Sequence, residues 1–149
     1  MRLLIQRVKS ARVDVENKTV GSIEVGALVL IGVTHGDDQS KAVWLASKLI
    51  NLRMFEDEQN KMNRSLIDIK GSVLIVSQFT LYGDCSDGRR PSFTNAALPN
   101  IAEPLYETFI EEVKKSGLPV ATGIFGAYMQ VSLVNDGPVT FIIDSKTIS

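Results

Sequence analysis

The chain has 149 residues, of which 16 are basic and 17 acidic, and a formal net charge of −1. This balance excludes a protein that coats nucleic acid through a broad basic surface, although a few local Arg and Lys side chains can still contact RNA. With 44% hydrophobic residues the chain can bury its own core, so we expect one domain over residues 1–149. Cys85 is the only cysteine, and the longest apolar run is far shorter than the roughly 20 residues of a membrane span. We therefore expect a cytoplasmic protein with no membrane partner.

The first third of the chain predicts strands. Apolar and polar residues alternate around Val13 and Val15, Asn17-Lys18 offers a turn, and residues 20–25 carry the returning strand. A continuous apolar run at residues 27–33 indicates a buried strand.

From Gln39 the apolar spacing changes to that of a helix. Ala42, Leu45, Ala46 and Leu49 fall at positions i, i+3, i+4 and i+7, and Asp37 or Asp38 lies near the expected start of the helix. These four residues therefore predict one buried helix face.

The middle of the chain predicts further short strands. We expect one at residues 52–55, a polar stretch at 56–64, alternation at Ile67 and Ile69, and a buried central strand at 73–76.

A second helix is expected at roughly residues 102–116, with Pro104 in its first turn and Gly117 as its cap. Strands return at residues 129–133 and 139–143, separated by the turn sequence Asn135-Asp136-Gly137-Pro138. Strands at both ends and two main helices between them predict an α+β fold with the helices on one side of the sheet.

Composition also limits the chemistry. His35 is the only histidine, whereas a hydrolytic zinc site usually takes two or three, so we expect no metal. A Ser-His-Asp or Cys-His mechanism would have to use His35, which we interpret as a solvated loop residue or a hydrogen bonder at a helix entry. The chain contains no Walker A pattern and no G-x-G-x-x-G, so we expect no cofactor.

Two polar segments are the remaining candidates for a site. Ser77-Gln78-Phe79-Thr80 follows the central strand, where active-site groups often collect, although a strand end can simply turn polar. Asn135-Asp136-Gly137-Pro138 is a hairpin turn that needs no function. The residues alone allow a metal-free hydrolase and do not choose a substrate.

Both segments resemble a known pair of motifs. Ser77-Gln78-Phe79-Thr80-Leu81 and Asn135-Asp136-Gly137-Pro138-Val139-Thr140 are similar to S-Q-F-T-L and N-x-G-P-x-T of the bacterial and eukaryotic D-aminoacyl-tRNA deacylases. The similarity continues in order and spacing at Gln6-Arg7-Val8, at Arg53-Met54-Phe55, at residues 88–93, and at Phe125-Gly126-Ala127 with Met129. Asp87 departs from the family, which has a basic residue before Gly-Arg-Arg.

The resemblance implies a layered fold of antiparallel and mixed sheets and an enzyme that hydrolyses a carboxylic ester. Its substrate would be D-aminoacyl-tRNA, or glycine mischarged on tRNA(Ala), bound at the 3′ end of the tRNA. The family is a homodimer with active sites at the interface. There, Gly137 and Pro138, joined by a cis bond, would enter the partner's pocket and exclude an L side chain. Arg7 would hold that turn across the interface by donating to its carbonyls.

The same resemblance assigns catalysis to Thr80 and Gln78. Thr80 could attack as a nucleophile, but no histidine adjoins it in the sequence. We favour an oxyanion hole made by backbone N–H groups near Phe79 and Thr80, with Gln78 placing the substrate and the 2′-OH of the terminal adenosine assisting.

Other residues would bind the RNA end. Ser77 and Phe79 would surround the ester, whereas Phe125 and Met129 would line the adenosine pocket. Arg89, Arg90 and the pair Lys114-Lys115 are candidate phosphate contacts.

Two alternatives stay open. One is an acyl hydrolase that uses Thr80 on a small ester or amide. The other is a non-enzymatic dimer that binds RNA or protein, in which the Gly-Pro turn only pins the interface. We expect no DNA partner.

Overall fold

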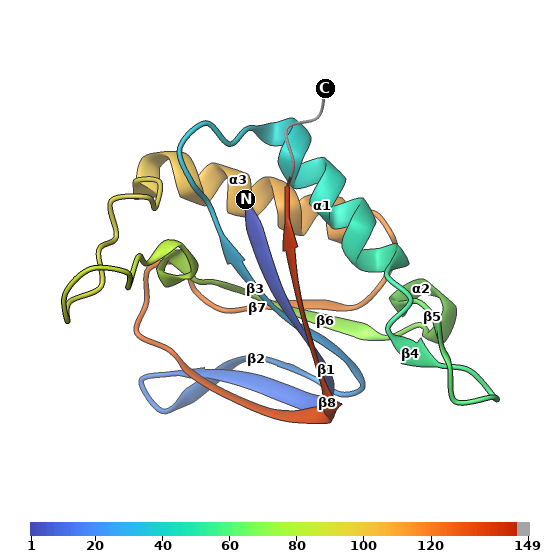
Figure 1. The fold of residues 1–149 in the computed structure, drawn as a ribbon. Helices are drawn as coiled ribbons and strands as arrows, with labels where there is room; N and C mark the ends of the chain where they lie inside the picture. The colour runs from blue at the N-terminus through green and yellow to red at the C-terminus, as the bar shows by residue number, and fades with distance from the viewer. Residues whose placement is uncertain (146–149) are drawn as a thin grey trace.

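The computed structural model describes residues 1–145, so residues 146–149 of the expected domain lie outside the described part. Figure 1 shows the elements, whose order and bounds are β1 (Arg2–Val15), β2 (Lys18–Ile23), β3 (Gly26–Gly32), α1 (Gln39–Asn51), β4 (Phe55–Glu56), β5 (Met62–Arg64), α2 (Leu66–Ile69), β6 (Ser72–Ser77), the 3₁₀-helix η1 (Phe79–Tyr82), α3 (Pro99–Lys114), β7 (Val120–Thr122) and β8 (Gln130–Asp144). Among residues 1–145, no helix is long and apolar enough to cross a membrane.

A mixed sheet of six strands organises the fold, in the order β2-β1-β3-β6-β7 with β8 paired to β1. The first half of β1 pairs with β3, its second half pairs with β2, and β8 runs antiparallel along nearly all of it. The strands β3, β6 and β7 are parallel to one another. The sheet curls so far that a β-carbon on Gly21 of β2 would lie 2.6 Å from the carbonyl oxygen of Thr122 in β7, which leaves room only for glycine.

The curled sheet separates two hydrophobic cores. Figure 1 shows α1 and α3 side by side on one face, and Val29 and Ile75 pack beneath them. The neighbouring residues Leu28 and Leu74 face the second core, inside the curl. Successive residues of β3 and β6 are therefore buried on both faces, which explains why each strand is a continuous apolar run.

The first expected helix is confirmed. α1 begins after Asp38, whose carboxylate accepts a hydrogen bond from the backbone N–H of Lys41 at 3.2 Å. Its buried residues are the four that the spacing indicated, Ala42, Leu45, Ala46 and Leu49.

The strand indicated by Ile67 and Ile69 is wrong, because these residues form α2. The Ser65 hydroxyl accepts from the N–H of Asp68 at 3.2 Å, and the Asp68 carboxylate accepts from the N–H of Ser65 at 2.8 Å. This reciprocal capping box stabilises a helix of one turn, and the Ser-x-x-Asp pattern was its sequence signal.

The second main helix, α3, begins earlier than expected. Pro99 lies at its start, and Pro104 lies inside the helix rather than in its first turn. The expected cap is displaced, because Lys115 is the C-cap of α3; Gly117 lies two residues beyond it, takes a positive φ of 83°, and its N–H donates to the Lys114 carbonyl at 3.0 Å. The expected strand at residues 52–55 is displaced to β4, which pairs with β5 across the polar stretch.

The hairpin turn expected at residues 135–138 is also wrong. Both flanking segments belong to β8, which continues in one direction along β1. The unpaired residues 136–139 form a bulge within that long strand, so the chain does not reverse there.

Candidate active site

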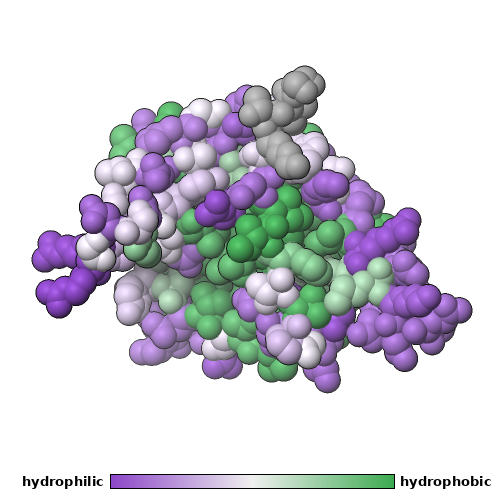
Figure 2. Space-filling view, in the orientation of Figure 1, coloured by the Kyte–Doolittle hydropathy of each residue, from purple (hydrophilic) through white to green (hydrophobic). Residues whose placement is uncertain are grey.

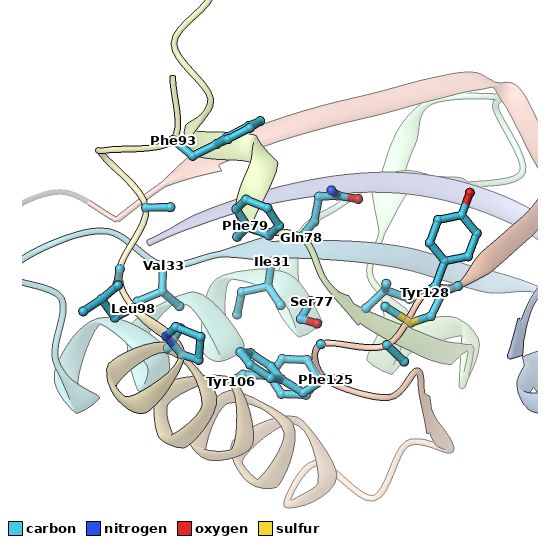
Figure 3. Close-up of a pocket in the computed structure, with 18 of the residues that line it drawn as sticks. Ile31, Val33, Ser77, Gln78, Phe79, Phe93, Leu98, Tyr106, Phe125 and Tyr128 are labelled. Atoms are coloured by element: carbon cyan, nitrogen blue, oxygen red, sulfur yellow. The ribbon is translucent and has the colours of Figure 1, made fainter. Parts of the chain in front are cut away.

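A cleft of about 540 Å³ opens where the parallel strands β3 and β6 end. The N-terminal turn of α3 and the segment from residue 125 to residue 131 form its other walls (Figure 3). Five of the expected site residues line it: Ser77, Gln78, Phe79, Phe125 and Met129. The other lining residues are not among those expected at the site: Ile31, Val33, Val76, Phe93, Ala96, Ala97, Leu98, Pro99, Ala102, Tyr106, Gly126, Ala127, Tyr128 and Val131. Of these, Phe93, Gly126 and Ala127 lie in the stretches of the sequence that resemble the deacylases.

The end of β6 turns directly into η1 at the floor of the cleft. The backbone N–H of Gln78 still donates to the Ile31 carbonyl at 2.8 Å, and the Gln78 carbonyl already accepts from Leu81 at 3.2 Å. Hydrogen bonds within a 3₁₀-helix join residues three apart, so the N–H groups of Phe79 and Thr80 have no acceptor inside η1. Two backbone donors therefore lie beside the cleft.

Thr80 adjoins the cleft without lining it. Its hydroxyl accepts a hydrogen bond from the side-chain amide of Gln78, as part of a local pair between these two residues. His35, the only histidine, instead contacts the Thr94 carbonyl at 2.7 Å. Thr80 thus lacks the neighbouring imidazole that would activate a hydroxyl nucleophile.

Two pairs of aromatic rings line the cleft. Phe79 and Phe93 meet edge to face with ring centroids 5.2 Å apart, and Tyr106 and Phe125 are 5.7 Å apart. The Tyr106 hydroxyl donates to the Ile75 carbonyl at 3.2 Å, and burial raises the pKa of Tyr106 to about 12. Tyr106 is therefore a neutral, fixed wall, and the apolar cleft suits a flat aromatic ligand such as a nucleobase.

The second motif lies in the bulge of β8. In the register of the two strands, Gln6 pairs with Thr140 and Val8 pairs with Asn135. Only Arg7 lies between the two pairs on β1, whereas the four residues 136–139 lie between them on β8. The Asn135 side chain accepts from the Val139 N–H at 3.0 Å and donates to the Thr140 hydroxyl at 3.1 Å. The first and last residues of N-x-G-P-x-T therefore tie the two sides of the bulge together.

Within this bulge the Gly137–Pro138 peptide bond is cis. Arg7 is 6% exposed, and its Nε donates to the Asp136 carbonyl at 3.0 Å. One terminal nitrogen donates to the Met54 carbonyl at 2.9 Å, and the carboxylates of Glu56 and Asp136 each lie 3.8 Å from the guanidinium. Arg7 thus holds the bulge of its own chain, and a contact across an interface stays a prediction.

The cleft and the bulge are far apart within one chain. Arg7 is level with Ala27 of β3 and Val73 of β6, whereas Ser77, where the first motif begins, lies four residues further along β6. Four residues along a strand span about 13 Å, and the three strand spacings between β8 and β6 add about 14 Å across the sheet. Gly137, Pro138 and Arg7 therefore do not join the Ser77–Thr80 segment in a single copy.

The candidate phosphate contacts differ in their surroundings. Lys114 pairs with Glu111 at 3.4 Å and Lys115 pairs with Glu112 at 2.5 Å, both on their own helix. Arg89 and Arg90 lie in the exposed loop between Asp84 and Ser92, which pair with each other. The arginines are thus the better candidates for phosphate contacts.

Within residues 1–145, no three His, Cys, Asp or Glu side chains cluster closely enough to hold a metal ion.

Comparison with known proteins points to one family. Residues 4–144 match the model of the family described as D-Tyr-tRNA(Tyr) deacylase. A D-aminoacyl-tRNA deacylase of Thermosipho africanus is 61% identical over 148 residues, covering 99% of each chain. The D-aminoacyl-tRNA deacylase of Bacillus cytotoxicus is 58% identical over 146 residues, covering 98% of this chain and all of the relative.

Solved structures share the fold. A protein named c-Myc DNA Unwinding Element Binding Protein superposes with a TM-score of 0.92 at 38% identity, covering 99% of this chain and 100% of that chain. A probable eukaryotic D-amino acid tRNA deacylase superposes with a TM-score of 0.83 at 20% identity, covering 95% and 97%. The expected α+β fold is confirmed.

Proposed function

This chain belongs to the D-Tyr-tRNA(Tyr) deacylase family and hydrolyses the ester of D-aminoacyl-tRNA, and we propose that it does so in the cleft at the end of β6. The observation that carries the assignment is the position of Ser77, Gln78 and Phe79, since these first three residues of the first motif line that cleft. The enzyme needs no resident cofactor on this proposal, and it acts on tRNA in the cytoplasm.

The terminal adenosine of the tRNA binds between the aromatic walls. Phe125 and Met129 contact the base, because aromatic and thioether surfaces stack well on nucleobases. The ester then lies over Gln78 and the first turn of η1. Gln78 positions it, and Ser77 and Phe79 surround it.

Hydrolysis is the attack of one water molecule on the ester carbonyl carbon. The carbonyl oxygen becomes an oxyanion that accepts hydrogen bonds from the N–H groups of Phe79 and Thr80. The bond from carbon to the ribose 3′ oxygen then breaks, and the proton released by the water passes to that oxygen. Free D-amino acid and tRNA leave, and the neighbouring 2′-OH assists the proton transfer.

A second copy of the chain completes the site on this proposal. The bulge cannot reach the cleft of its own chain, so it has a substrate to contact only in a partner. β8 is paired on one edge only among the described strands, and it exposes Val134 and Ile142. Figure 2 shows hydrophobic residues gathered in the middle of the face along which β1 and β8 run. An unpaired apolar edge of this kind favours association with an identical strand.

The bulge supplies the chiral filter. The backbone carbonyls of Gly137 and Pro138 accept from the substrate amino group and leave no room for an L side chain. Arg7, Asn135 and Thr140 hold the bulge in place, so no side-chain rotamer can relax this wall. Glycine has no side chain to exclude, and the filter therefore admits glycyl-tRNA.

A comparison of three substrates tests the activity. The enzyme is incubated with D-tyrosyl-tRNA, L-tyrosyl-tRNA and D-tyrosine methyl ester. Cleavage of the first substrate alone is expected. Cleavage of the methyl ester at a similar rate would favour a small-ester hydrolase that uses Thr80, and cleavage of none would favour a non-enzymatic dimer.

Complementation tests the shared site. Gln78→Ala disables the cleft, and Gly137→Ala disables the bulge, because an added β-carbon would lie 2.6 Å from Val139 at a φ of 134°. If the two variants mix at random, half of the dimers contain one chain of each. One of the two sites in such a dimer combines an intact cleft with an intact bulge, so about a quarter of wild-type activity should return. Mixed dimers without activity above either parent would show that each chain acts alone.

The nucleic acid partner is the 3′ end of tRNA, and we expect no DNA binding although one relative is named for a DNA element. The near-balanced charge disfavours a duplex surface. Fluorescence anisotropy with labelled duplex DNA and labelled tRNA at one salt concentration compares the affinities for the two nucleic acids. Equal affinities would contradict this expectation.

A further inference from the structure

The outer wall of the cleft is a short segment, residues 92–97, that leads from the exposed arginine loop into α3. It lies against residues 33–35, which follow β3. The N–H of Ala97 donates to the Val33 carbonyl at 2.9 Å, and the Thr34 hydroxyl donates to the Asn95 carbonyl. The contact between His35 and the Thr94 carbonyl, at 2.7 Å, is the last of this series.

The chemistry of that contact shows which ring nitrogen of His35 carries a hydrogen. A carbonyl oxygen can only accept, so the Nε2 of His35 carries the hydrogen. The neutral tautomer with a proton on Nε2 and the protonated ring both have this donor. The hydrogen bond therefore does not require a charged histidine.

The residue next to Thr94 is Phe93, whose ring meets Phe79 at the mouth of the cleft (Figure 3). Both residues are exposed to solvent, Phe93 at 42% and Phe79 at 56%. Burial alone cannot hold such rings in one place. The backbone on either side of Phe93 has to be fixed, and the hydrogen bond from His35 to Thr94 fixes one side.

We propose that His35 is a positioning residue of the deacylase site, which holds Phe93 against Phe79 through the Thr94 carbonyl. The Phe79–Phe93 pair then sets the width of the cleft for the terminal adenosine. This inference rests on the proposed binding of the adenosine in the cleft, and His35 itself touches no substrate.

Two variants separate the hydrogen bond from the bulk of the ring. His35→Phe keeps a flat ring without the donor, and His35→Gln restores an N–H donor at a similar distance from the backbone. We expect His35→Phe to raise KM for D-tyrosyl-tRNA by about 2- to 12-fold, the range that one such hydrogen bond supports, with kcat nearly unchanged. His35→Gln should recover most of that loss.

Asn51→Ala is the matched control, because it also removes a bond from an exposed side chain to a backbone carbonyl, that of Ser47 at 2.9 Å. It lies at the far end of α1, so KM should not change. In a Phe93→Ala background, His35→Phe should have no additional effect, since its target is already absent. An additional rise in KM there would overturn the inference.

Hydrogen exchange gives a readout that does not depend on activity. The N–H of Ala96 donates to the Phe93 carbonyl at 3.1 Å and that of Ala97 donates to the Val33 carbonyl, and both N–H groups should exchange faster in His35→Phe. Unchanged exchange together with unchanged KM would overturn the role of His35 and leave the deacylase activity intact. Faster exchange with unchanged KM would also overturn it. If Phe93→Ala then left KM unchanged as well, the binding of adenosine in the cleft would itself be wrong.

Discussion

Replacing Arg7 by methionine would test how the proposed chiral filter is held. The guanidinium is 6% exposed and donates to two carbonyls from distant segments, Asp136 in the bulge and Met54 before β4. Methionine fills most of the same space without a donor. The substitution therefore removes the polar contacts while leaving the packing largely intact.

The magnitude follows from these contacts. A hydrogen bond from a charged donor contributes about 1.5–3 kcal/mol, and the buried Met54 carbonyl left without a donor costs about 1–3 kcal/mol, whereas the Asp136 carbonyl is only partly buried and costs less. Removing the buried charge relieves part of its desolvation cost, so the free energy of unfolding should fall by about 3–5 kcal/mol. Arg7→Lys keeps the charge, but its single ammonium cannot reach both carbonyls. This variant should lose about half as much free energy of unfolding as Arg7→Met.

Urea denaturation followed by circular dichroism measures this loss. At an m-value of about 2 kcal/mol per M, a loss of about 4 kcal/mol lowers the midpoint by about 2 M. Arg12→Met is the control on the same strand, because Arg12 pairs with Asp14 at 3.2 Å and is 59% exposed. Such an exposed pair contributes about 0–1 kcal/mol. All variants need the same protein concentration, since the proposed dimer would make the urea midpoint depend on it.

A second readout links Arg7 to selectivity. If Arg7 holds the wall formed by Gly137 and Pro138, then Arg7→Lys should hydrolyse L-tyrosyl-tRNA measurably at an enzyme dose at which the wild type does not. Equal urea midpoints for Arg7→Met and Arg12→Met, together with full rejection of the L substrate by Arg7→Lys, would refute the reasoning.

Three further predictions concern the chemistry. Thr80→Ala should keep substantial activity on D-tyrosyl-tRNA, because the backbone donors survive the change, and a fall in kcat of more than about 10⁴-fold with binding intact would make Thr80 the nucleophile. Dialysis against EDTA, with magnesium controlled for tRNA folding, should leave the rate unchanged, and restoration of a lost rate by one specific metal would contradict this. On one tRNA body, the glycyl and D-alanyl esters should be cleaved and the L-alanyl ester should resist. Rejection of the L-alanyl ester requires a rigid wall, since a soft pocket discriminates one methyl by only about 1–3 kcal/mol. A resistant glycyl ester would mean that the site recognises the D side chain directly.

Features with a local signal could be predicted from the sequence. Ala42, Leu45, Ala46 and Leu49 recur at helical spacing, so α1 and its buried face followed directly. The two motifs also indicated the family, and five residues expected at the site do line one cleft. Ile67 and Ile69 do not by themselves indicate a helix, because two alternating residues fit a strand as well as a single helical turn. The capping box of Ser65 and Asp68 selects the helical turn α2.

Only the tertiary structure decided how the motifs are used. Asn135-Asp136-Gly137-Pro138 has the composition of a hairpin turn, yet it is a bulge because β1 continues beside β8 and Arg7 fills the gap from the other end of the chain. Phe93 and Tyr106 face the cleft because His35 and Ile75, both distant in sequence, fix their segments. Periodicity reports which face of one element is buried, whereas these contacts join residues that are far apart along the chain, and such contacts leave no local pattern to read.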